Sequence, residues 1–315
     1  RDTALQALVN WLAPEKQRRK RKIEKEAKAM TTETGGCSPA QKKTATESEI
    51  RVRTGAVITL TGILVLYFSR YAYVLEAAAA MLSIMGIVEL LRAAKCCTWY
   101  NVLLLSLIAA AVCMRRLPYY TEILLFVWVL AIVAFALFMS RMKEIHSIGF
   151  WHILPCALML PIFFYSAVEI RRWPQGLAVL IFVTLGCTVN DVGAYFVGRA
   201  VGTHKLAPII SPGKTVEGGL GGMVSSVILM SLIASLYSQC AGVEIRYGWL
   251  FLYLFLASIV GQFGDLAMST IKRTVGIKDF SRVLPGHGGI LDRFDSFLFV
   301  APFAVLYGNM TGCFL

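Results

Sequence analysis

Long apolar segments alternate with short polar stretches from about residue 54 to the end of the chain. Each segment is near the length, about 20 residues, that crosses the hydrocarbon layer of a bilayer as an α-helix. We therefore predict an all-α, polytopic integral membrane protein with about nine transmembrane helices, at 54–70, 72–91, 98–114, 117–139, 150–169, 176–198, 215–240, 247–270 and 290–312.

The composition also indicates a membrane protein. Of the 315 residues, 57% are hydrophobic and 16% are charged, and the mean hydropathy is +0.65. A soluble domain is closer to 45–50% apolar and about 25% charged. The eight cysteines show no metal-binding spacing, and most lie in apolar segments, where cysteine behaves as a small hydrophobic residue. They do not indicate a disulfide framework.

The first 53 residues form a polar tail with 13 Lys and Arg residues against seven acids. A basic, helix-prone run is followed there by a linker rich in Gly, Ser and Thr. We expect this tail, residues 1–53, to be mostly disordered and to lie in the cytoplasm against anionic lipid headgroups, rather than to bind nucleic acid. Residues 54–315 then form the membrane domain.

The basic residues of the loops predict the orientation of the chain. With the tail in the cytoplasm, the loops at 92–97, 140–149, 199–214 and 271–293 are cytoplasmic too. The tail and these loops hold 25 Lys and Arg residues, against six on the other side, as the positive-inside rule requires. The sequence leaves open whether the membrane is a bacterial inner membrane or that of an organelle.

The densest group of charges lies at 269–295, between two apolar segments. Six basic residues and three carboxylates fall within 27 positions, and Asp265 lies just upstream in an apolar run. Charges at a membrane boundary are costly unless something there needs them. This mixture fits a polyphosphate with its divalent cation, because carboxylates bind the cation while Lys and Arg bind phosphate oxygens.

Helical spacing brings some of these side chains together. Asp265, Ser269 and Lys272 share one helix face, and Asp292 and Asp295 share another at the start of the last apolar segment. We expect Asp265, Asp292 and Asp295 to converge on Mg²⁺, which commonly takes one or two carboxylates with waters and substrate phosphates. Simple salt bridges to the neighbouring Lys and Arg residues are the alternative.

The turn before the last apolar segment is rich in glycine and contains His287. Gly288 and Gly289 could expose N–H groups to a phosphate, and the following helix N-terminus adds a favourable field. The alternative for His287 is a turn residue satisfied by the backbone.

A second polar region, residues 190–222, is expected to complete the site. Asn190 and Asp191 interrupt an apolar helix, and carboxylates within spans usually have a function. The stretch SPGKT resembles a P-loop only superficially, since the first Gly and the preceding strand are missing. The glycines from 218 to 222 indicate close helix packing. The other candidate substrate-binding residues of this region are Lys205, Ser211, Lys214 and Glu217.

Four further acids lie in or near the apolar segments without clustering. We interpret them as packing or interfacial residues: Glu76, Glu89, Glu122 and Glu169.

The charged stretch resembles the signature of the phosphatidate cytidylyltransferases, also called CDP-diacylglycerol synthases. The matching positions are Ser269, Ile271, Lys272, Arg273, Lys278, Asp279, Ser281, Leu284, Pro285, His287, Gly288, Gly289, Ile290, Asp292, Arg293, Phe294 and Asp295. The region from Asn190 to Gly219 is similar to a second block of the same family, except at Gly213 and Val216, where Lys or Arg and Trp are expected. The resemblance is strong over 185–300 and absent from the tail.

The resemblance implies an all-helical membrane enzyme that makes CDP-diacylglycerol and pyrophosphate from CTP and phosphatidic acid. It implies Mg²⁺, leaves room for a second cation such as K⁺, and leaves a homodimer open. Asp265, Asp292 and Asp295 would hold the cation, whereas Lys272, Arg273, Lys278 and Arg293 would bind the phosphates of CTP or of the lipid.

Two other functions fit the same pattern. A CTP-using membrane enzyme of the polyprenol-kinase type would also need metal and basic loops. In a secondary transporter, Asp191 and Asp265 would be ion-coupling groups near the midplane. Against the transporter, the charges gather at one membrane face and no internal repeat is visible. The CDP-alcohol phosphotransferases are excluded because their aspartate motif is absent.

Overall fold

The computed structural model describes residues 39–71, 73–114, 119–141 and 150–314. The chain divides into two units, residues 1–53 and residues 54–315. The disorder predicted for the tail falls on residues 1–38, outside the described residues, whereas residues 39–53 are helical.

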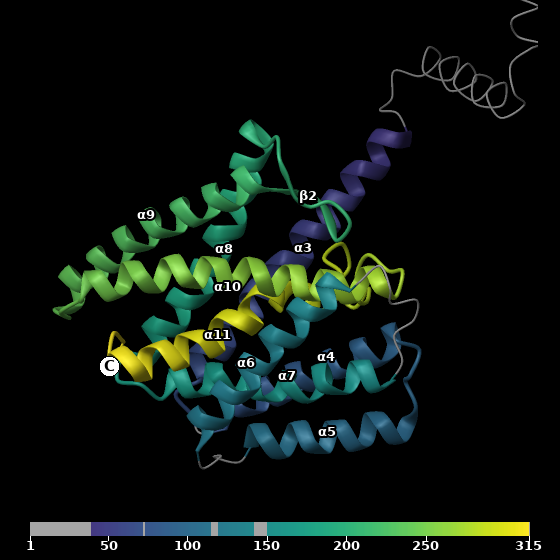
Figure 1. Cartoon of the computed structure of the whole chain (residues 1–315), viewed down its shortest axis with the longest axis horizontal. Helices are drawn as coiled ribbons and strands as arrows, with labels where there is room; N and C mark the ends of the chain where they lie inside the picture. Colours follow the sequence, from purple (N-terminus) through teal and green to yellow (C-terminus); the bar gives the residue numbers. More distant parts are fainter. Residues whose placement is uncertain (1–38, 72, 115–118, 142–149, 315) are drawn as a thin grey trace, which may run out of the picture. The chain divides into compact units, whose positions relative to one another are not determined.

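The described residues are almost entirely helical, which confirms the predicted all-α class (Figure 1). A two-stranded antiparallel hairpin, which the sequence did not predict, lies between α8 and α9. In chain order the elements are α3 (Pro39–Phe68), α4 (Val74–Ala93), α5 (Trp99–Met114), α6 (Tyr120–Ser140), α7 (Phe150–Arg171), α8 (Gly176–Val201), β1 (Lys205–Ala207), β2 (Ser211–Thr215), α9 (Val216–Ala241), α10 (Tyr247–Thr274) and α11 (Leu291–Thr311).

Seven of the described helices are long and apolar enough to cross a membrane, which confirms an integral membrane protein. The two exceptions are α5, with 16 residues, and α11, which carries Asp292, Arg293 and Asp295 in its first turns. The count of nine spans therefore remains a prediction.

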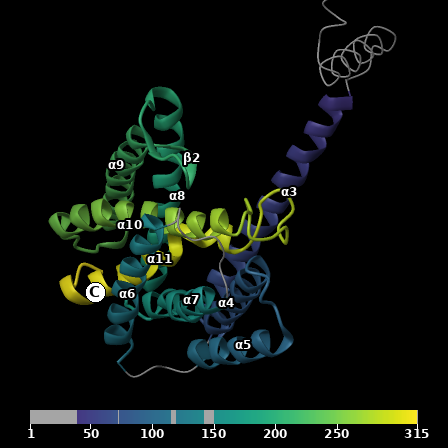
Figure 2. The same ribbon diagram turned by 45° about the vertical axis from the view of Figure 1, so that its right-hand side comes forward.

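Within residues 54–315 the helices pack in three groups. One contains α4, α5 and α7, a second pairs α10 with α11, and a third pairs α8 with α9 (Figures 1 and 2). Aromatic rings join the first two groups: Phe299 of α11 lies edge-on to Phe163 of α7, at 5.7 Å between ring centroids, and to Phe263 of α10. Because α11 is largely buried, its charged first turn is held in a fixed place.

Small residues bring α8 and α9 close together, as the glycine pattern predicted. A Cβ on Gly222 would lie 2.5 Å from the carbonyl oxygen of Asn190, and one on Gly218 would lie 2.8 Å from that of Ala194. Neither distance leaves room for a side chain. The backbone at Asn190 and Asp191 is therefore held tightly against the start of α9.

Candidate active site

Two carboxylates meet where α10 crosses α11. A Cβ on Gly264 would lie 2.8 Å from the carbonyl oxygen of Asp295, so the two backbones touch beside Asp265. The charge of Asp295 interacts with those of Asp265 and Asp191, and Asp191 interacts with Asp265 and Lys214. We call Asp191, Asp265 and Asp295 the carboxylate cluster.

Lysine and serine side chains surround this cluster. Lys214, from β2, forms an ion pair with Asp265 of α10. The Ser269 hydroxyl donates to Asp265 at 3.3 Å, as the shared helix face predicted. Lys272 interacts with Asp295 through its charge. Negative and positive groups from α8, β2, α10 and α11 therefore gather at one place.

Asp292 has different hydrogen-bond partners from the carboxylates of the cluster. One of its oxygens accepts from the Lys272 ammonium at 2.8 Å, and the other accepts from the backbone N–H groups of Phe280 and Gly289, each at 2.9 Å. Both Asp292 and Lys272 are buried. Asp292 thus closes the loop between α10 and α11 and holds Lys272 in place.

The expected metal-binding trio of Asp265, Asp292 and Asp295 is therefore not assembled in this structure. Among the described residues, no three His, Cys, Asp or Glu side chains lie close enough together to hold one metal ion. The carboxylate whose charge interacts with those of both Asp265 and Asp295 is Asp191, on α8.

Glu89 of α4 is a site residue that the sequence analysis missed. Its buried carboxylate accepts from the Ser281 hydroxyl at 2.6 Å and from the backbone N–H groups of Ile290 and Leu291, each at 2.9 Å. The N–H groups of Ile290 and Leu291 lie at the start of α11, where backbone N–H groups have no hydrogen-bond partner within the helix. Glu89 therefore caps α11 from another helix, a structural role that is more specific than the packing or interfacial one predicted. The sequence signal that could have identified Glu89 is its position as a carboxylate inside an apolar segment.

The glycine-rich turn uses its N–H groups internally. Gly288 has a φ of +85° and donates to the carbonyl of Leu284 at 3.0 Å, while Gly289 donates to Asp292. A Cβ on Gly289 would lie 2.7 Å from the carboxylate of Glu89. The turn expected to cradle a phosphate is thus packed against the two carboxylates that shape it. The Nδ1 atom of His287 is buried without a hydrogen-bond partner among the described residues.

The hairpin that carries Lys205 and Lys214 is fastened by Glu217. Its carboxylate accepts from the backbone N–H groups of Thr203 and His204 at 3.1 Å and pairs with the His204 ring. Glu217, expected to bind substrate, therefore shapes the hairpin. Ser211 begins β2 opposite Ala207, next to the hairpin turn.

Arg273 and Gln262 join separate elements around the site. The Arg273 guanidinium donates to the carbonyls of Ile210 and Ile277, at 3.1 and 2.9 Å, and so links the hairpin to the α10–α11 loop. Gln262, which the sequence analysis did not single out, donates to Asn190 at 3.3 Å and to the carbonyl of Gly219 at 2.9 Å. It connects α10 with α8 and α9.

Three of the basic side chains that the sequence analysis predicted to bind phosphate or substrate remain available to a ligand. Lys205, Lys278 and Arg293 are exposed, and none of them forms an ion pair within the described part of the chain. They lie on the hairpin, on the α10–α11 loop and at the start of α11.

A sequence model described as "Cytidylyltransferase family" matches residues 49–311. The chain belongs to the cytidylyltransferase family. The match covers every residue of the carboxylate cluster, and it starts near the end of the polar tail.

Several relatives are named phosphatidate cytidylyltransferase. The one from Bacillus subtilis (strain 168) is 42% identical over 183 residues, which is 58% of this chain and 65% of the relative. Those from Staphylococcus saprophyticus and Staphylococcus haemolyticus are 47% and 48% identical over 128 and 129 residues, each 41% of this chain and 48% of the relative. The matches thus span less than two thirds of the relatives' own length.

Proposed function

We propose that this cytidylyltransferase family member transfers the cytidylyl group of CTP to phosphatidic acid. The observation that carries the proposal is the carboxylate cluster with Lys214 and Lys272 beside it, in a chain that is similar to proteins named phosphatidate cytidylyltransferase. A phosphate oxygen of the lipid attacks the α-phosphorus of CTP, and the bond from that phosphorus to the bridging oxygen breaks. The products are CDP-diacylglycerol and pyrophosphate.

This reaction does not need a strong general base. The lipid phosphate is already an anion, so the protein has to hold two polyanions together and to neutralise the charge that grows on the leaving pyrophosphate. Exposed Lys205, Lys278 and Arg293 supply positive charge from the hairpin, from the α10–α11 loop and from the start of α11. Lys214 and Lys272 supply charge next to the carboxylates.

The residues present fit a divalent cation held partly by substrate. Asp265 and Asp295 would hold Mg²⁺, with Asp191 beside them, and CTP phosphates and water would complete its shell, because Mg²⁺ commonly binds one or two carboxylates in such sites. When bound, it would neutralise phosphate charge. A second cation such as K⁺ stays an expectation.

Positioning residues make up the rest of the site. Asp292 holds Lys272, Glu89 holds the start of α11, and Arg273 and Glu217 hold the hairpin. Since each of these contacts joins different elements, together they fix the positions of the phosphate-binding Lys and Arg side chains relative to one another.

We further propose that the site faces the cytoplasm. The ends of α8 and α10 and the starts of α9 and α11 meet there, and these are the ends joined by the basic loops. In this orientation CTP comes from the cytoplasm, while the diacyl chains of phosphatidic acid stay in the bilayer.

The deciding test is Mg²⁺-dependent conversion of radiolabelled CTP into an organic-extractable lipid. Purified protein receives phosphatidic acid in mixed micelles, and the Asp295→Ala variant is assayed alongside. Label in CDP-diacylglycerol from the unsubstituted protein alone supports both reaction and site. A chain that binds CTP but, in a parallel assay with CTP labelled at the γ-phosphate, transfers that phosphate to a polyprenol would be a lipid kinase. Light scattering of the same sample tests whether the protein forms the homodimer that the resemblance leaves open.

A further inference from the structure

The carboxylate cluster contains an ion pair whose partners come from different elements. Lys214 of β2 pairs with one carboxylate oxygen of Asp265 on α10, and the other oxygen accepts from the Ser269 hydroxyl at 3.3 Å. Both oxygens of a residue proposed to hold the cation are therefore in use. A lysine ammonium and a divalent cation on one carboxylate repel each other, so Lys214 and the cation compete for Asp265.

The two lysines beside the cluster differ in their freedom to move. Lys272 is held by Asp292 at 2.8 Å, and its side chain is 9% exposed, so it is a fixed charge. The side chain of Lys214 is 28% exposed and that of Asp265 is 24% exposed, so water reaches this pair. A partly exposed ion pair is a weak contact. Lys214 can therefore leave Asp265 when another anion is at hand.

The backbone that carries Lys214 is anchored, so only the side chain has to move. Thr215, the next residue, is buried, and its hydroxyl accepts from the N–H of Gly218 at 3.1 Å at the start of α9. A Cβ on Gly202 would lie 2.6 Å from the same hydroxyl oxygen, so the end of α8 packs closely against it. The flexible four-carbon stem of lysine can carry the ammonium from a carboxylate to a neighbouring phosphate.

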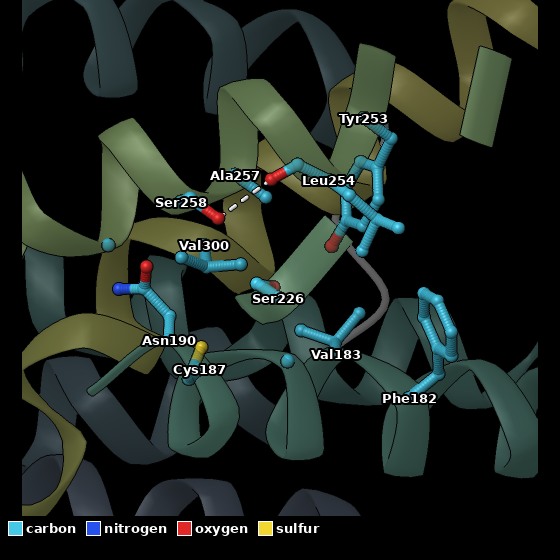
Figure 3. A pocket seen from close by; sticks show the side chains of 12 residues that line it. Phe182, Val183, Cys187, Asn190, Ser226, Tyr253, Leu254, Ala257, Ser258 and Val300 are labelled. Atoms are coloured by element: carbon cyan, nitrogen blue, oxygen red, sulfur yellow. Dashed lines mark hydrogen bonds between the residues drawn. The ribbon is translucent and has the colours of Figure 1, made fainter. Parts of the chain in front are cut away.

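The seam between α8 and α10 is closed next to the cluster. Figure 3 shows this seam, which runs along α8 from Asn190 to Phe182 and faces Ala257 of α10. Its free volume is about 10 Å³, which is room for one water molecule. Mg²⁺ gives up its bound water reluctantly, so it does not pass along this seam. A hydrated cation therefore approaches the cluster from the side of the hairpin, where Lys214 lies.

The cluster also contains an oxygen that can serve an incoming cation. Ser296 follows Asp295 on α11, is 4% exposed and lies beside Asp191. Its hydroxyl makes no hydrogen bond of regular geometry within the described residues, whereas buried polar atoms normally have a partner. A bound cation with its water shell would supply that partner.

We propose that Lys214 is the counter-ion of the carboxylate cluster in the free protein, and that the divalent cation binds as a complex with the nucleoside triphosphate rather than alone. The inference rests on the proposed function. Free Mg²⁺ would have to displace Lys214 into water, whereas a metal–triphosphate complex offers the ammonium a phosphate oxygen in place of Asp265. Because no three metal-binding side chains come together among the described residues, phosphate oxygens are also needed to complete the shell. Lys214 thus couples binding of the cation to binding of CTP.

The test measures the Kd of Mn²⁺ alone, by electron paramagnetic resonance of the purified protein in detergent. Mn²⁺ is chosen because carboxylate and water ligands suit it as they suit Mg²⁺. Lys214→Met removes the competing charge, so Mn²⁺ should bind about tenfold more tightly than to the unsubstituted protein. Lys214→Arg keeps the charge and should leave the Kd of Mn²⁺ unchanged. In the CTP-to-lipid assay, Lys214→Met should raise the KM for CTP, since a phosphate loses its ammonium partner.

Lys205→Met is the matched control for the Kd of Mn²⁺, because Lys205 is an exposed lysine of the same hairpin without an ion pair in the described part of the chain. Unchanged or weaker Mn²⁺ binding in folded Lys214→Met protein would overturn the inference, and so would equal tightening in Lys205→Met. If Lys214→Met does not fold, Lys214→Gln replaces it with the same expectation. The Mn²⁺ measurement contains neither CTP nor lipid, so it does not depend on the reaction. No CDP-diacylglycerol from the unsubstituted protein would overturn the proposed function, whatever the Kd of Mn²⁺.

Discussion

Glu89 in α4 accepts a hydrogen bond at 2.9 Å from the backbone N–H of Leu291, 202 residues further along the chain. With Ile290 and Ser281 as additional donors, this single carboxylate fixes the first turn of α11 and the loop before it. Asp292 and Asp295 lie in that turn, so their position depends on a helix that has no other part in the site.

We predict that Glu89→Gln lowers both stability and turnover. The amide would replace a charged acceptor with a neutral one, and a hydrogen bond to a charged group contributes about 1.5–3 kcal/mol. We expect a fall in kcat of about 10–100-fold, the range seen when residues that support a site are removed, and a lower Tm. The assay is CTP-to-lipid turnover together with thermal unfolding in detergent.

The matched control for this prediction is Glu122→Gln, because Glu122 is an exposed acid on α6. It should behave like the unsubstituted protein. Glu89→Gln with full kcat would show that the start of α11 does not need this contact.

Asp292→Asn should remove activity and also destabilise the protein. The sequence analysis predicts Asp292 as a metal ligand, but in the structure it neutralises buried Lys272. Removing one partner of a buried ion pair typically costs about 3–5 kcal/mol. Thermal unfolding of Asp292→Asn, Lys272→Met and the double variant tests this, with the double variant expected to be more stable than the sum of the two single losses.

Chelation of divalent cations should stop turnover, and added Mg²⁺ should restore it. Asp265→Asn and Asp295→Asn should each raise the Mg²⁺ concentration needed for half-maximal activity by about tenfold or more, since they remove the carboxylates proposed to hold the cation. A Mg²⁺ titration at fixed CTP measures the shift. Asp279→Asn, an exposed acid on the α10–α11 loop, is the control, and an equal shift in all three variants would contradict the assignment.

Glu217→Ala should loosen the hairpin without unfolding the membrane helices. The N–H groups of Thr203 and His204 lose their acceptor, so amide hydrogen exchange over residues 203–216 should accelerate. Because Lys214 is carried by this hairpin, kcat/KM for CTP should fall by about tenfold, an effect on positioning. Faster exchange with unchanged kcat/KM would mean that the hairpin does not contribute to catalysis.

The helices were predictable from the sequence to within a few residues for most elements, because apolar length alone determines where a chain can cross a bilayer. Asp265 and its neighbour Ser269 were predictable for a similar reason, since helical spacing puts them on one face. These are local relationships.

The remainder of the site depends on contacts between distant segments. Asp292 and Asp295 share a face by spacing, yet the N–H groups of Phe280 and Gly289 draw Asp292 toward the loop. Asp191 on α8 interacts with Asp265 on α10, a helix that lies more than 70 residues further along the chain. Neither the partners of Glu89 nor those of Gln262 can be found from a periodic pattern, since they belong to other helices.

The contact between Glu89 and the start of α11 also affects how the protein is made. A ribosome synthesises α4 about 200 residues before Leu291 exists, so the nascent chain enters the membrane with a carboxylate that has none of its final hydrogen-bond donors. During that interval α10 can carry Asp265 into the bilayer while α11 is still missing. The site is therefore completed late in biogenesis, and a nascent chain that has not yet inserted α11 lacks Asp292 and Asp295 in their final positions.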